Sequence, residues 1–318
     1  MKSILVYGWY NKKNIGDDLF VSSFEKLFPT YKFKFAYQLT KSLLDDADAV
    51  ILGGGSFLSK DIAAPSDVIA TLKTKKIMYI GVGAETDISP MHLELMSLAK
   101  LVAIRSPEQL DKVRALNVNT IAIPDIVYSL QNEVALSPKK NKSVLILPNI
   151  EVVPNHEAAH WKYSSFEYFK SEFSQFLDEI ISNGYSINFF SMCHNATMSD
   201  EWASAQIIGM MKRRSINYQL PYVAGDMKEI TAVMSQYSHI ITQRYHGIVL
   251  AEMMGTPYTN IHHHDKLKYA SPMNGNRHSY YGLLKQDLLH SFYNSSSGLP
   301  LKRDIFDTLK QRVINILS

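Results

Sequence analysis

The chain has 318 residues, 46% hydrophobic and 20% charged, with a formal net charge of +3. This length suffices for about two domains, and the charge is too small for the basic patch of a nucleic-acid-binding protein. Its single cysteine, Cys193, excludes an intramolecular disulfide and fits a cytoplasmic setting. No apolar run approaches the ~18 residues of a membrane span, and the N-terminal apolar stretch is too short for a signal peptide. We expect a cytoplasmic protein without an integral membrane segment; peripheral membrane contact stays open.

Short β-branched runs alternate with amphipathic stretches through the first 130 or so residues. Residues 17–28, for example, place Leu19, Phe20 and Phe24 on one helical face. The predicted strands are 3–8, 31–37, 49–55, 76–83, 101–105 and 120–125. This alternation predicts a parallel sheet with helices on both faces.

The alternation pauses at the polar, lysine-rich stretch 131–142, which includes Pro138, and then restarts. The second set of predicted elements comprises strands 143–148, 185–192, 239–243 and 257–261, with helices 165–184, 226–236, 247–255 and 304–317. We therefore expect an α/β fold of two Rossmann-like domains, residues 1–135 and 144–300, facing each other across a cleft. Residues 136–143 are the expected linker, and 301–318 the expected C-terminal helix, able to pack back on the N-terminal domain.

Ligands of open parallel sheets bind beyond the carboxyl ends of the strands, which selects several candidate residues. In the first half these are Asn14, Gly16, Asp17, Gly54, Gly55, Ser56 and Arg105. Glycines allow a ligand to approach the backbone, and the polar side chains can contact an anion. Each also has a structural interpretation: a tight turn, an Asp N-cap or a surface arginine.

The stretch TQRYHG, residues 242–247, lies where a predicted strand gives way to a predicted helix. The unpaired amides and partial positive charge of a helix N-terminus favour an anion. Arg244 adds a planar fork for a carboxylate or phosphate, and His246 adds a proton donor. Gly247 removes a Cβ where a ligand would be crowded. A purely structural Arg-x-His remains the alternative.

Two further patterns are weaker candidates for chemistry. In the stretch 262–264, His262 and His264 could share one face of a strand and bind a metal, but a cleft-lining or solvated loop is favoured. We therefore predict no metal site. Cys193 and His194 are adjacent, which makes them a poor nucleophile–base couple.

Taken in order, these motifs resemble the polysaccharide pyruvyl transferase family from about residue 4 to about residue 270. The resemblance is carried by Asn14-Ile15-Gly16-Asp17, Gly53-Gly54-Gly55, GVGAE (81–85), IRS (104–106), Asp125, and the set Arg244, His246, Ala251, Gly255 and Pro257. Val82 stands where the family usually has Gln, and no acidic residue follows Arg105. The family also often has an Arg at the end of the strand 143–148, where this chain reads LPNI.

The resemblance implies a GT-B-like fold and transfer of a pyruvyl group from phosphoenolpyruvate to two hydroxyls of a sugar or glycan, forming a ketal. It implies neither a metal nor an organic cofactor. The implied donor-binding residues are Arg244, Tyr245, His246, Gly247 and Arg105. The implied cleft or acceptor residues are Asn14, Gly16, Gly54, Gly55, Ser56 and Asp125. The catalytic candidates are His246, Arg244 and Asp17.

The general base is assigned to Asp17, with Asp125 as the second candidate. The acceptor is a glycan of unspecified kind, free, polymeric or lipid-linked. Two other functions stay open: a GT-B glycosyltransferase that uses a nucleotide-sugar donor, and a non-catalytic glycan- or anion-binding relative.

Overall fold

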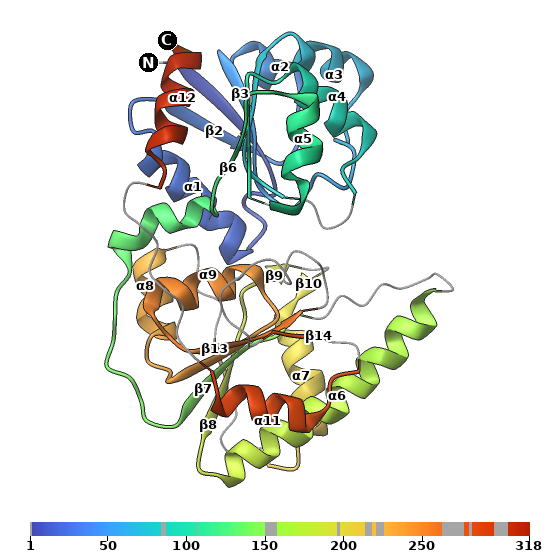
Figure 1. The fold of residues 1–318 in the computed structure, drawn as a ribbon, viewed down its shortest axis with the longest axis vertical. Coiled ribbons are helices and arrows are strands. Elements are labelled where there is room, and N and C mark those ends of the chain that lie inside the picture. The colour runs from blue at the N-terminus through green and yellow to red at the C-terminus, as the bar shows by residue number, and fades with distance from the viewer. Residues whose placement is uncertain are drawn as a thin grey trace. The chain divides into compact units, whose positions relative to one another are not determined.

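A computed structural model describes residues 2–83, 87–105, 107–149, 158–195, 198–213, 218–220, 226–262, 277–279, 282–295 and 305–318. These residues form two α/β units (Figure 1). The first unit comprises Met1–Lys12, Gly16–Asn132 and Leu301–Ser318, and the second comprises Lys13–Ile15 and Glu133–Pro300. Within the described ranges, no helix is both long and apolar enough to cross a membrane.

The first unit is built on a six-stranded sheet whose described strands are all parallel. The strands are β1 (Ser3–Tyr7), β2 (Lys32–Ala36), β3 (Ala49–Gly55), β4 (Lys76–Val82), β5 (Leu101–Ile104) and β6 (Thr120–Ala122). Their order is β2-β1-β3-β4-β5-β6, so the chain reverses its direction of progress across the sheet between β1 and β3. All six predicted strands of this half are confirmed.

Helices cover both faces of the first sheet (Figure 1). They are α1 (Ile15–Leu27), α2 (Lys41–Asp45), α3 (Ser66–Lys73), α4 (Pro90–Leu98), α5 (Leu110–Leu116) and α12 (Asp307–Leu317). Ser89 shows how the sequence starts one of them: its hydroxyl accepts the amide of His92, and Pro90 occupies the first helical position.

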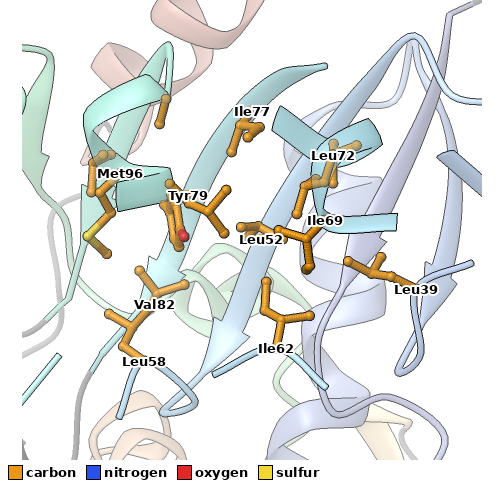
Figure 2. Packing of buried hydrophobic residues seen from close by; sticks show 14 of the residues in the cluster. Leu39, Leu52, Leu58, Ile62, Ile69, Leu72, Ile77, Tyr79, Val82 and Met96 are labelled. Carbon is orange, nitrogen blue, oxygen red and sulfur yellow. The ribbon is translucent and has the colours of Figure 1, made fainter. Parts of the chain in front are cut away.

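The core on one face of this sheet packs strand side chains against α2 to α5. Figure 2 shows Leu52, Tyr79 and Val82 from the strands among side chains such as Leu72 of α3 and Met96 of α4. Residues two apart along a strand share a face, so Val50 and Leu52 both enter this cluster while Ile51 is absent from it. The apolar runs of the sequence therefore correspond to strands buried on both faces.

The second unit has its own six-stranded sheet, again parallel throughout its described strands. Its strands are β7 (Ser143–Leu147), β8 (Ser186–Phe190), β11 (Tyr218–Leu220), β12 (His239–Thr242), β13 (Tyr258–His262) and β14 (Arg277–Ser279). The order β11-β8-β7-β12-β13-β14 is the 3-2-1-4-5-6 order of a Rossmann domain, with its reversal between β7 and β12. The sequence analysis did not identify β11 and β14, which are only three residues long.

Five helices and a small hairpin complete the described part of the second unit. The helices are α6 (Ala158–Ser182), α7 (Asp200–Met210), α8 (Met227–Met234), α9 (Tyr245–Met254) and α11 (Lys285–Tyr293). The hairpin pairs β9 (His194–Asn195) with β10 (Met198–Ser199) in antiparallel fashion. Figure 1 shows α6, α7 and α11 on one side of the sheet and α8 and α9 on the other. Helix α7, which follows the hairpin, was not predicted.

The stretch expected as a linker, 136–143, is hydrogen-bonded to the second unit. The Ser137 amide donates to Ser235 Oγ at 2.9 Å, and the Lys140 amide donates to the Gln236 carbonyl at 2.7 Å. The change of unit falls earlier, between Asn132 and Glu133. At the other end of the chain, Leu301–Ser318 is grouped with the first unit, where Lys76 Nζ donates to the Ile316 carbonyl at 3.1 Å.

Candidate functional site

Three of the predicted residues of the first unit meet at the carboxyl ends of its strands. Arg105 directly follows β5, and its guanidinium donates to the Asp125 carboxylate and, at 3.0 Å, to Ser56 Oγ. Asp125 also accepts the amide of Val127 at 2.9 Å. Both charged side chains of the pair are buried. Because Arg105 and an amide already engage the buried Asp125 carboxylate, this environment argues against Asp125 as the general base.

The glycine triplet that ends β3 lies at the reversal point of the first sheet, and its packing explains two of the glycines. Gly54 and Gly55 have φ of +73° and +86°, which other residues rarely adopt. A Cβ on Gly54 would lie 2.6 Å from the Phe20 ring of α1, and one on Gly55 would lie 3.2 Å from Asp17 Oδ1. These glycines therefore let the start of α1 approach the strand end, and Asp17 lies beside that turn.

The motif Asn14-Ile15-Gly16-Asp17 is divided between the two units. Gly16 and Asp17 belong to the first unit, whereas Lys13–Ile15 belong to the second. There Asn14 forms an antiparallel bridge with Cys193. The Ile15 amide donates to the Met192 carbonyl at 2.9 Å, and the His194 amide donates to the Lys13 carbonyl at 2.8 Å. Asn14 therefore lies against the segment that follows β8.

Arg244 lies at the carboxyl end of β12 and is the N-cap residue of α9, at the predicted strand-to-helix junction. Its amide donates to Thr242 Oγ1 at 2.9 Å. Its guanidinium forms an ion pair with Asp200, the first residue of α7, and the two side chains are 12% and 1% exposed. The sequence analysis did not identify this carboxylate partner.

Asp200 joins Arg244 to the segment after β8. One carboxylate oxygen accepts a hydrogen bond from the Arg244 guanidinium, and the other accepts hydrogen bonds from the amides of Met192 at 2.9 Å and Cys193 at 3.0 Å. Burial raises the pKa of the Asp200 carboxyl, against the opposite influence of Arg244 and the two amides. The group is thus a buried acid held in place by three donors.

The reversal point of the second sheet lies beside Arg244. The Asn149 amide, two residues beyond the end of β7, donates at 3.2 Å to the side-chain oxygen of Gln243, which precedes Arg244. This bond links the segments that follow β7 and β12, the two strands between which the order reverses. Ligands of Rossmann-type sheets bind at this place.

The first turn of α9 carries the other donor-binding candidates. Tyr245 and His246 are partly buried, and their ring centroids are 5.3 Å apart in an edge-to-face arrangement. Gly247 is buried: a Cβ there would collide with Thr242 Oγ1 and lie 2.7 Å from Leu147 Cδ1. Protein packing therefore already requires glycine at 247, which corrects the expectation that it leaves room for a ligand.

A second acidic residue of α7, also absent from the sequence predictions, contacts the hairpin. Glu201 Oε1 lies 2.5 Å from His194 Nδ1, and Glu201 Oε2 accepts the Ser199 hydroxyl. The available sequence signal was Ser199-Asp200-Glu201, a serine followed by two acids, which is typical of a helix start.

Some predictions fall on residues outside the described ranges. These are Ala84 and Glu85 of GVGAE, Ser106 of IRS, Ile150 of LPNI, and His263 and His264; the side chain of His262 is likewise not described. Among the residues that are described, no group of three or more His, Cys, Asp or Glu side chains could hold a metal ion.

The model of the polysaccharide pyruvyl transferase family matches residues 4–264, so the chain belongs to this family. The protein is accordingly a transferase of polysaccharide biosynthesis. No curated protein matches the chain.

Solved structures show the same fold at low sequence identity. MnaA of S. aureus, in a structure with UDP, is 11% identical with a TM-score of 0.62, covering 99% of this chain and 95% of that one. A putative UDP-N-acetylglucosamine 2-epimerase of Listeria monocytogenes is 10% identical with a TM-score of 0.59, covering 98% and 94%. The UDP-GlcNAc 2-epimerase of Neisseria meningitidis, bound to UDP-GlcNAc, is 9% identical with a TM-score of 0.58, covering 99% and 100%. With the two parallel sheets, these likenesses establish the predicted GT-B-like α/β fold.

Proposed function

We propose that the protein transfers the pyruvyl group of phosphoenolpyruvate to two hydroxyls of a sugar or glycan, forming a pyruvate ketal. The observation that carries this proposal is the position of Arg244 in a member of the pyruvyl transferase family. Arg244 caps α9 beside the reversal point of a Rossmann-type sheet. A helix N-terminus and a guanidinium together suit a small ligand with two anionic groups.

In this proposal Arg244 and the first amides of α9 bind the donor oxyanions. Asp200 fixes one edge of the guanidinium and thereby its orientation. His246, in the same turn, contacts the phosphate and protonates it as it leaves, or protonates the methylene carbon.

The first-unit residues keep a proposed role in acceptor binding. Asp17 is the member of this set that can act on an acceptor hydroxyl, since Asp125 is buried against Arg105. Arg105, predicted as a donor contact, orients Asp125 and Ser56 within its own unit. No cofactor enters the proposed reaction, because phosphoenolpyruvate itself supplies the leaving group.

Calorimetric binding of phosphoenolpyruvate, combined with phosphate release across a panel of sugar acceptors and mass analysis of the products, tests the proposal. His246→Gln and Arg244→Lys should each weaken donor binding by about 1.5–3 kcal/mol, roughly 10- to 150-fold. Arg213→Ala, at an exposed arginine of the same unit, is the matched control.

Each outcome separates the functions that the sequence left open. Binding of nucleotide sugars without binding of phosphoenolpyruvate would identify a nucleotide-sugar enzyme instead. Donor binding without phosphate release in the presence of any acceptor would identify a non-catalytic relative. Unchanged donor affinity in both variants would remove the start of α9 from the site.

A further inference from the structure

A histidine–carboxylate pair lies next to the Arg244–Asp200 pair. His194, in the β9–β10 hairpin, contacts Glu201, in the first turn of α7, with 2.5 Å between Nδ1 and Oε1. Their side chains are 50% and 28% exposed, so a ligand in solvent can reach the imidazole. The sequence analysis considered His194 only as a partner of Cys193, and it did not identify Glu201.

Two peptide bonds connect the two pairs. Asp200, which binds Arg244, directly precedes Glu201, and Cys193, whose amide Asp200 accepts, directly precedes His194. The His194 amide also donates to the Lys13 carbonyl, next to Asn14 of the family motif. His194 is therefore held by its own backbone to the same framework that fixes the proposed donor-binding arginine.

Glu201 is held more firmly than the acid of an ordinary surface ion pair. The Ser199 hydroxyl donates to its second oxygen. Burial raises the pKa of Glu201, but the hydrogen bonds from Ser199 and His194 lower it, and the net pKa is below its usual value. A carboxylate fixed in this way sets the orientation and tautomer of the imidazole that it contacts, as in acid–base dyads of enzymes.

We propose that His194, oriented by Glu201, is the general base that takes a proton from an acceptor hydroxyl, a role that rests on the proposed pyruvyl transfer. The imidazole nitrogen opposite Glu201, Nε2, accepts the hydroxyl proton while the hydroxyl oxygen forms its bond to C2 of the donor. C3 has gained a proton to become a methyl group, and the C2–O bond to phosphate breaks with its electron pair leaving on phosphate. The second hydroxyl then closes the ketal at C2.

The protons balance over the whole reaction. Two hydroxyls lose one proton each; one proton ends on C3 and the other on the released phosphate. His194 passes its proton on to complete this balance and returns to its neutral form. Glu201 stays ionised and is a positioning residue.

The test uses the full chain and measures kcat by phosphate release and donor affinity by calorimetry. General-base catalysis contributes ~10²- to 10⁴-fold, so His194→Gln should lower kcat by roughly 100-fold or more while donor affinity is kept. Added imidazole should restore part of the activity of His194→Ala. His290→Gln, at an exposed histidine of α11 in the same unit, is the control and should leave both quantities unchanged.

Glu201→Gln tests the positioning role through coupling. It should lower kcat, and its effect should be largely absent when His194 is already Gln, because two residues that act as one unit are not additive. Wild-type kcat in His194→Gln, or additive effects, would overturn this inference alone. A wild-type protein that releases no phosphate would instead overturn the proposed function, and the role of His194 with it.

Discussion

Removing one partner of the buried Arg244–Asp200 pair should strongly destabilise the second unit. Asp200→Asn keeps one oxygen for the amides of Met192 and Cys193 but leaves the guanidinium without its counter-charge. Removing one partner of a buried pair costs about 3–5 kcal/mol, because the other charge stays desolvated. We expect about 3 kcal/mol for Asp200→Asn, and a value nearer 5 kcal/mol for Asp200→Ala, which also loses the acceptor of two amides.

A double variant distinguishes the effect of an unpaired charge from the effect of lost packing. Arg244→Met combined with Asp200→Leu removes both charges, so it should be more stable than the less stable of Arg244→Met alone and Asp200→Leu alone. Glu179→Gln is the matched control in the same unit. Glu179 pairs with Lys285 at 2.8 Å but is 39% exposed, so its loss should cost at most about 1 kcal/mol.

Urea unfolding followed by tryptophan fluorescence provides the assay. The chain has three tryptophans, and in a Trp9→Phe background the remaining two, Trp161 and Trp202, both belong to the second unit. Trp202 lies in α7 and stacks on Phe166, with 6.3 Å between ring centroids. Losses below about 1 kcal/mol in both Asp200 variants would show that the pair does not hold α9 to α7, and would refute the structural part of the site.

Two further predictions concern pH and packing. Burial lowers the pKa of His92 to about 4, so the unfolded state binds the proton more tightly than the folded state. The contribution of neutral His92 to the free energy of unfolding is therefore fully present above about pH 6.5 and is lost as the pH falls toward 4, by ~2 kcal/mol between pH 7.5 and 5. In urea unfolding, the free energy of His92→Gln should change with pH by that much less than that of the wild type, and an identical pH dependence would contradict the assignment. Gly247→Ala should cost ~1–3 kcal/mol, because its Cβ meets Thr242 and Leu147. Gly209→Ala, in α7 with no atom within 4 Å of the new Cβ, should instead stabilise by up to ~1 kcal/mol; equal effects in the two variants, measured by thermal unfolding, would argue against the packing explanation of Gly247.

The position of Arg244 was readable from the sequence because it depends on local patterns. The apolar run in 239–243 predicts a strand, and the apolar spacing after Gly247 predicts a helix, so Arg244 and His246 had to lie at a strand-to-helix junction. The same reasoning placed Arg105 at the end of β5 and the glycine triplet at the end of β3. The order of these motifs along the chain also indicated the family.

The partners of these residues were decided by contacts between segments far apart in sequence. Asp200 precedes Arg244 by 44 positions, and Asp125 follows Arg105 by 20, so no local period connects either pair. Gly247 offered room for a ligand in the sequence, but Thr242 and Leu147 fill that space. The pair His194–Glu201 depends on the antiparallel strands β9 and β10, each two residues long, and on α7, elements that the pattern analysis did not identify.

The sequence by itself thus determined the α/β alternation, the strand ends and the residue types that they present, because strand and helix formation follow hydrophobic periods of two and 3.6 residues. Only the tertiary structure decided the strand orders, the place where each sheet reverses and the charge that faces each arginine. The physical reason is that burial makes an unpaired charge costly, and its partner can come from any segment that folding brings within reach.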